Sequence, residues 1–224
     1  MSQDDDSLCN SAYQYFKCAK PLDFSYRNLV SLEGIRHSQE LPIPIFLNGN
    51  EKPLPLRVRG APKKSSKSNR YRTGSFWLNK NYLKNVNGLR NLADRLFEMA
   101  DYLSWLDLSD NNLTTISDEF LLFPNLSMLY LHKNNIHDVV DAYKLRNLKK
   151  LRTLTLHKNP MCGTPCYRST VIHFLPNIRK LDNVVVVRSE REQERKTLDK
   201  DVRVRLTNAY PEDFPCTLVS SKMR

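Results

Sequence analysis

Apolar and polar residues follow one pattern that occurs four times between residues 76 and 161. In each copy two apolar residues flank a single residue, an asparagine follows three positions after the second, and another apolar residue comes two positions later. The copies begin 30, 23 and 25 residues apart. A helix would repeat its apolar residues every three or four positions, so the pattern instead predicts four copies of one folding unit. The copies consist of Phe76, Leu78, Asn81 and Leu83; Leu106, Leu108, Asn111 and Leu113; Leu129, Leu131, Asn134 and Ile136; and Leu154, Leu156, Asn159 and Met161.

Each copy predicts a short strand followed by a turn. Residues two positions apart point to one face of a strand, so Leu106 and Leu108 face a core. Asn111 falls where the chain leaves the strand, and its amide offers both a donor and an acceptor to backbone groups that no ladder uses. One unit cannot bury its apolar face alone, whereas stacked units share a core. The sequence therefore predicts an α/β solenoid with a short curved parallel sheet on its concave face, helices or irregular turns on its convex face, and a C-terminal helical cap.

The same pattern divides the chain into segments. Residues 21–32 carry the apolar positions of a further copy, with Arg27 in place of the asparagine. About two periods separate Leu22 from Phe76, so a second degenerate copy using Leu54 and Leu56 has room between them. The segments are an N-terminal arm at 1–20, degenerate N-terminal repeats with a basic loop at 21–72, regular repeats at 73–160, a cap at 161–187 and a charged tail at 188–224.

Further elements are expected between and after the strands. The polar, basic residues 61–72 predict a disordered loop. Apolar residues at helical spacing, including Leu89, Leu96 and Met99, predict a convex helix within 85–100. The remaining elements are a helix at 167–175, a short edge strand at 184–187 and a solvated helix within 189–206.

The net charge of +11 is concentrated in one part of the chain. Residues 52–93 contain eleven Lys and Arg and no Asp or Glu. Such a segment is a solvated loop, a contact for an acidic or tubulin-like protein surface, or a phosphate-binding site; few aromatic residues lie among the charges, so direct nucleic-acid binding is the least favoured. The candidate contact residues are Arg57, Arg59, Lys63, Lys64, Lys67, Arg70 and Arg72.

Residues beside the core leucines point out of the concave face and include large aromatic groups that the core does not need. Exposed clusters of this kind mark partner sites, and Trp and Tyr are typical anchors. The alternative is that a tail or the segment 33–72 covers them. An open face predicts that Trp105→Ala leaves stability nearly unchanged, and a covered face predicts a loss. The candidate protein-binding residues are Trp77, Trp105, Asp107, Met128, Tyr130, His132, Thr155 and His157.

Motifs for catalysis or cofactor binding are not found in the sequence. It contains no glycine-rich phosphate loop and no nucleophile elbow, so neither an enzyme nor a cofactor is expected. His157, Cys162, Cys166 and His173 have the chemistry of zinc ligands. A histidine on the concave face, equivalent to His132, and cysteines beside a loop are the preferred interpretation, so no metal site is predicted.

The sequence also bears on where the protein acts. Residues 1–10 lack a basic region followed by an apolar one, so they do not resemble a signal peptide. No apolar run approaches the roughly 20 residues of a membrane span. We therefore expect a cytoplasmic protein with no membrane partner, whose five cysteines are reduced thiols.

Residues at the end of the repeats resemble those of a known family. Tyr167-Arg168, Leu175-Pro176-Asn177 and Leu181-Asp182 are similar to the cap of the intracellular SDS22-like leucine-rich repeat family, whose period of 20–29 residues the repeats also match. The resemblance covers roughly residues 21–187. It implies a non-enzymatic cytoplasmic protein that acts as a protein–protein interaction scaffold, in a cilium or axoneme. The alternative that it implies is an RNA-associated, spliceosome-type adaptor that binds through an RNA-binding protein.

Overall fold

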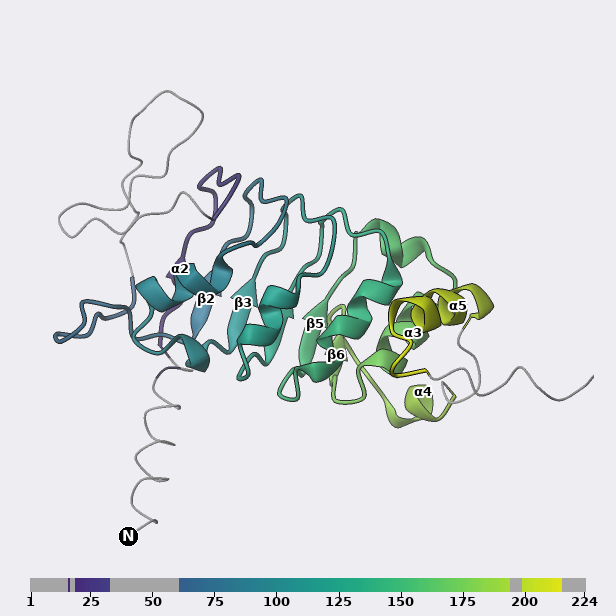
Figure 1. The fold of residues 1–224 in the computed structure, drawn as a ribbon. Coiled ribbons are helices and arrows are strands. Elements are labelled where there is room, and N and C mark those ends of the chain that lie inside the picture. The colour runs from purple at the N-terminus through teal and green to yellow at the C-terminus, as the bar shows by residue number, and fades with distance from the viewer. Residues whose placement is uncertain (1–15, 17–18, 33–60, 194–198, 215–224) are drawn as a thin grey trace, which may run out of the picture.

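A computed structural model describes residues 16, 19–32, 61–193 and 199–214 as a solenoid with one sheet (Figure 1). The seven strands of this sheet lie side by side in chain order. The first six are parallel, and the seventh runs antiparallel to the sixth. The predicted α/β solenoid is therefore confirmed. The strands are β1 Leu22–Asp23, β2 Ser75–Trp77, β3 Trp105–Asp107, β4 Met128–Tyr130, β5 Thr153–Thr155, β6 Lys180–Leu181 and β7 Val184–Val185.

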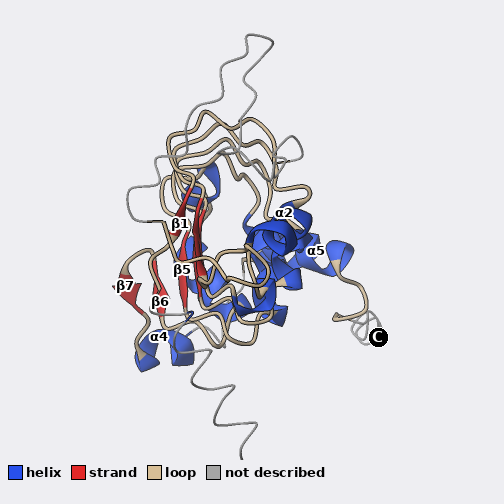
Figure 2. Cartoon of the chain, turned by 90° about the vertical axis from the view of Figure 1, so that its left-hand side faces the viewer, coloured by secondary structure: helices blue, strands red, loops and turns tan. Residues whose placement is uncertain are grey.

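Helices such as α2 (Leu89–Leu96) and α5 (Lys200–Ala209) lie on the side of the core opposite the parallel strands (Figure 2). The unit with 30 residues has room for a true α-helix, α2, whereas the two shorter units that follow turn back through 3₁₀ segments. The convex helix expected within 85–100 is shorter than that range, and Met99 lies outside it with 41% of its surface exposed. The helical segments are α2 Leu89–Leu96, η1 Ala100–Tyr102, η2 Asp118–Leu122, η3 Val139–Asn147, η4 Pro160–Gly163, α3 Tyr167–Phe174, α4 Arg188–Gln193 and α5 Lys200–Ala209.

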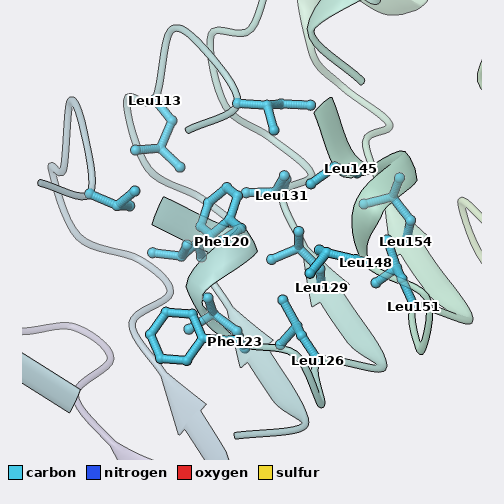
Figure 3. Packing of buried hydrophobic residues seen from close by; sticks show 14 of the residues in the cluster. Leu113, Phe120, Phe123, Leu126, Leu129, Leu131, Leu145, Leu148, Leu151 and Leu154 are labelled. Atoms are coloured by element: carbon cyan, nitrogen blue, oxygen red, sulfur yellow. The ribbon is translucent and has the colours of Figure 1, made fainter. Parts of the chain in front are cut away.

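The core runs through the whole stack of repeats. Phe76, Leu106, Leu129 and Leu154 are partners in register across β2 to β5, and all four are fully buried. Phenylalanines and leucines of the returning segments, such as Phe120, pack over them (Figure 3). Equivalent positions of neighbouring units therefore stack on one another, as the repeat spacing predicts.

Buried asparagines follow the strands β2 to β5 at the point where the chain turns, and together they form a ladder. The residue before each asparagine has a left-handed backbone, as Asp110 does with φ 52°, which turns the amide back into the core. Asn111 Nδ2 donates to the carbonyl oxygens of Leu78 and Leu108, both at 3.0 Å, and its Oδ1 accepts from Leu83 N at 3.1 Å. Each amide thus ties its own unit to the preceding one. The ladder consists of Asn81, Asn111, Asn134 and Asn159, all buried.

The N-terminal unit joins the regular repeats directly. Leu22 of β1 pairs with Phe76 of β2, and Arg27, in the asparagine position, is buried and donates its backbone N–H to Asn81 Oδ1 at 2.9 Å. The second degenerate copy, with Leu54 and Leu56, falls outside the described residues. That second copy therefore stays a prediction.

The basic segment 61–72 forms a hairpin, so the expectation of a disordered loop there is wrong. Lys64 and Tyr71 form an antiparallel bridge, and Tyr71 also pairs with Phe97 at the end of α2. The prediction failed because a low content of apolar residues favours disorder, whereas here one buried aromatic side chain and several backbone hydrogen bonds hold the segment.

The charged C-terminal segment also differs from the expected single solvated helix. It contains two helices, α4 and α5, and α5 packs against η3 on the convex side. Val202 and Leu206 of α5 are buried. Arg205 forms an ion pair with Asp138 at 2.8 Å. The charges that dominate this stretch therefore hide a short apolar face that binds the repeats.

Shortening the buried side chain of α5 should reduce stability. Val202→Ala removes two methyl groups from the contact with the convex side, so we expect the free energy of unfolding to fall by about 1–2 kcal/mol. Val204→Ala on the same helix is the control, since 52% of Val204 is exposed. Urea unfolding of both variants measures the difference, and equal midpoints would show that α5 does not pack here.

None of the helices that the structure describes is both long and apolar enough to cross a lipid bilayer.

Candidate protein-interaction face

The parallel register places the outward-pointing residues of the strands in columns across the concave face. Ser75, Trp105 and Met128 are neighbours in one column. Trp77, Asp107, Tyr130 and Thr155 follow one another in the next. The sequence therefore brings the predicted concave residues together because equal offsets in each repeat become adjacent positions on the sheet.

Five of these side chains form a continuous line of rings, which we call the aromatic row. Trp77 packs edge-to-face on Trp105 with ring centroids 5.3 Å apart, and Trp105 packs in the same way on Tyr130 at 5.9 Å. Tyr130 lies 6.2 Å from His132, whose ring stacks on that of His157 at 4.5 Å with an interplanar angle of 11°. All five residues are partly buried, so the row is a continuous strip of rings that remains partly accessible at the surface.

The two tryptophans carry donors without a conventional acceptor. The Nε1–H groups of Trp77 and Trp105 are buried and have no hydrogen-bond partner among the described residues. Buried indole N–H groups usually find a partner. Both indoles pack edge-to-face within the row, an arrangement that places the positive edge of one ring near the negative face of another.

The polar members of the face are held by their neighbours. Thr155 is buried, and its Oγ1 lies 2.9 Å from His132 Nδ1, so this residue positions a histidine instead of offering an open contact as expected. Burial, together with nearby His157, lowers the pKa of His132. Asp107 accepts hydrogen bonds from the backbone N–H and the hydroxyl of Ser109 at 2.9 and 2.6 Å.

Two residues of the cap, Asp182 and Tyr167, lie at the His157 end of the row. The sequence did not place them in the site. Asp182 Oδ1 accepts from the backbone N–H of His157 at 2.7 Å, and Asp182 Oδ2 accepts from the Tyr167 hydroxyl at 2.9 Å. Burial is the main cause that raises the pKa of Tyr167. Asp182 follows the strand residue Leu181 as Thr155 follows Leu154, and that equivalence is the signal that could have placed it at the site.

The four His and Cys side chains that were considered as zinc ligands do not form one cluster. His157 belongs to the aromatic row, Cys162 Sγ contacts the Leu156 carbonyl oxygen at 3.2 Å, and Cys166 and His173 are exposed. Within the described ranges no three His, Cys, Asp or Glu side chains lie close enough to hold a metal ion.

The stacked parallel strands, the asparagine ladder and the helical cap are the features of a leucine-rich repeat protein. Comparison with known proteins gives the same class. The family model for leucine-rich repeats matches residues 80–206. The chain belongs to the leucine-rich repeat family, whose members are typically interaction modules without enzymatic activity.

Individual proteins with similar sequences or folds are known. The chain is 37% identical over 171 residues to leucine-rich repeat-containing protein 51 of Homo sapiens, a match that covers 76% of this chain and 81% of that protein. It is 39% identical over 90 residues to cilia- and flagella-associated protein 410 of Homo sapiens, covering 39% of this chain and 35% of that protein. A chain in the Drosophila melanogaster SNF/U2A′ complex has the same fold, with a TM-score of 0.51 and 24% identity, and the match covers 66% of this chain and 82% of that one.

Proposed function

We propose that this chain is a non-enzymatic scaffold whose aromatic row holds a segment of a protein partner. The observation that carries the proposal is the continuity of the row across β2 to β5: partly buried rings contact one another without a gap from Trp77 to His157. Clusters of large aromatic side chains are the usual anchors of protein interfaces. Asp107 and Met128 lie beside the row on β3 and β4 and would complete the contact.

We further propose that the protein acts in the cytoplasm, at a cilium or flagellar axoneme. The support is the similarity to a protein named for cilia and flagella. The alternative of an RNA-associated adaptor has less support, because the likeness to a chain of the SNF/U2A′ complex is at 24% identity and is a likeness of fold. Proximity labelling in ciliated cells tests the location. Labelling of splicing proteins without axonemal proteins would contradict the proposal.

The aromatic row is tested by Trp105→Ala. Loss of a central anchor should weaken partner binding by more than about 2 kcal/mol. The sequence-based expectation of nearly unchanged stability for an open face does not hold once these ring contacts are known. The same variant should lower the free energy of unfolding by about 1–3 kcal/mol, since Trp105 packs against both Trp77 and Tyr130 and each aromatic pair contributes about 0.5–1.5 kcal/mol. Stability measurements and capture of axonemal proteins from ciliated cells, at matched amounts of folded protein, check the two effects.

A control separates the row from aromatic residues in general. Tyr82 is 54% exposed and lies outside the row, so Tyr82→Ala should leave capture unchanged. If Trp105→Ala loses stability and still captures the same proteins as the parent, the row serves the fold alone and the proposed binding face is wrong.

A further inference from the structure

The basic segment presents its charges on a defined scaffold, which we call the basic hairpin, residues 63–72. The backbone N–H of Arg72 donates to the Lys63 carbonyl oxygen at 2.8 Å, and that of Ser65 donates to the Arg70 carbonyl oxygen at 2.8 Å. Asn69 adopts φ 55° in the turn. These bonds fix the two arms against each other, which sets the backbone positions from which the side chains project.

Tyr71 attaches the basic hairpin to the body of the solenoid beside α2 (Figure 1). Its side chain is 7% exposed. Its backbone N–H donates to the Leu96 carbonyl oxygen at 2.7 Å, and its carbonyl oxygen accepts from Glu98 N at 2.9 Å. Arg72 also forms an ion pair with Glu98 at 2.8 Å. The basic hairpin is therefore docked at the C-terminal end of α2, on different residues from those of the aromatic row.

Four cations of the basic hairpin remain without a carboxylate partner in the part of the chain that the structure describes. Lys63, Lys64, Lys67 and Arg70 are exposed, and none of them is in an ion pair among the described residues. Lys64 Nζ lies 4.9 Å from the centre of the Tyr71 ring, which leaves its charge unneutralised. A fixed group of uncompensated charges of one sign attracts a partner of the opposite sign.

We propose that the basic hairpin binds an acidic segment of a protein partner through its side-chain carboxylates. Single-stranded nucleic acid is favoured by aromatic rings on which bases stack, and the one aromatic residue of the basic hairpin, Tyr71, is buried. A bilayer surface is favoured by apolar side chains that insert beside the charges, and the turn residues 66–69 are all polar. Carboxylates need neither feature, because they pair directly with Lys and Arg.

The test is binding of a fluorescein-labelled peptide that alternates two glutamates with one glycine, measured by fluorescence anisotropy with the full chain. In the hairpin variant, Lys63, Lys64, Lys67 and Arg70 are changed to Gln. We expect its affinity to fall at least about tenfold, and the parent's affinity to fall steeply as NaCl rises from about 50 to about 200 mM, as expected for screened charges.

The control variant removes the same charge elsewhere, through Lys84→Gln, Arg179→Gln, Lys200→Gln and Arg203→Gln, all at exposed residues. It should lose less than about twofold, since none of the four residues belongs to the basic hairpin and exposed charges more than a Debye length away are largely screened. Equal losses in both variants, or no loss in the hairpin variant, would overturn the proposal. Tighter binding of single-stranded polyuridine or of phosphatidylserine vesicles through the same four residues would also overturn it, in favour of nucleic acid or membrane.

A second variant tests the role of the scaffold. Tyr71→Ala keeps all four cations and removes the buried anchor. It should weaken peptide binding by about threefold or more, because loosened charges lose conformational freedom when they bind. Trp105→Ala should leave this binding unchanged, which separates a failure of the hairpin proposal from a failure of the proposed function. Unchanged affinity in Tyr71→Ala would show that charge alone, without the fixed hairpin, accounts for the contact.

Discussion

Replacing Asn111 by alanine should lower the free energy of unfolding by about 1–3 kcal/mol, because one buried backbone N–H loses its acceptor and two buried carbonyl oxygens each lose one of two amide donors. Leu83 N–H loses its acceptor, and the carbonyl oxygens of Leu78 and Leu108 each lose one donor but keep the amides of the neighbouring ladder asparagines. The amide is 6% exposed, so water reaches these groups poorly. Urea or thermal unfolding of the purified chain measures the loss.

The neighbouring asparagine provides the control for this prediction. Asn112 is exposed, and no side-chain hydrogen bond is recorded for it within the described residues, so Asn112→Ala should change stability by less than about 0.5 kcal/mol. If Asn111→Ala and Asn112→Ala unfold at the same midpoint, the ladder does not hold neighbouring units together.

The ladder could be predicted from sequence because both of its requirements are local. An asparagine at a fixed offset from two apolar strand residues is a short-range pattern, and its repetition predicts the register of β2 to β5. Equal offsets in successive repeats likewise put Trp105 beside Ser75 and Met128 on neighbouring strands. What the spacing could not give is how far each outward side chain is covered, which is why Thr155 was expected on an open surface and lies buried.

The hairpin and α5 could not be predicted in this way because long-range contacts decide them. The basic hairpin is rich in charge and poor in apolar residues, and it is ordered by one buried ring, Tyr71, and by backbone bonds to the end of α2. In α5, two buried residues, Val202 and Leu206, outweigh a surface of charges. Composition averages over such segments, whereas a single anchor that reaches a distant part of the chain determines whether they pack.

Net charge is an incomplete guide to function, because it does not show where the fold places the charges or the other binding residues. The net charge of +11 belongs largely to residues 52–93. The structure describes this stretch from residue 61 onward, including the basic hairpin, and Arg57 and Arg59 lie outside the described residues. The aromatic row lies on the strands, where asparagines and leucines set its geometry. The two surfaces therefore depend on different parts of the fold, so we expect a variant of one surface to leave binding at the other surface unchanged.

Leu108→Ala should be among the most damaging single changes in the repeats, with a loss of about 2–5 kcal/mol in the free energy of unfolding, because the surrounding core relaxes only partly around the cavity. Leu108 is fully buried, and its carbonyl oxygen also accepts from the ladder amides of Asn111 and Asn134. A shift of the backbone toward the cavity would strain both bonds, which opposes collapse of the site and favours the upper part of the range. Leu122→Ala is the matched control, since 48% of Leu122 is exposed and its loss should stay below about 1 kcal/mol. Urea unfolding followed by circular dichroism compares the two, and similar midpoints would mean that Leu108 does not face the core and that the repeat register is wrong.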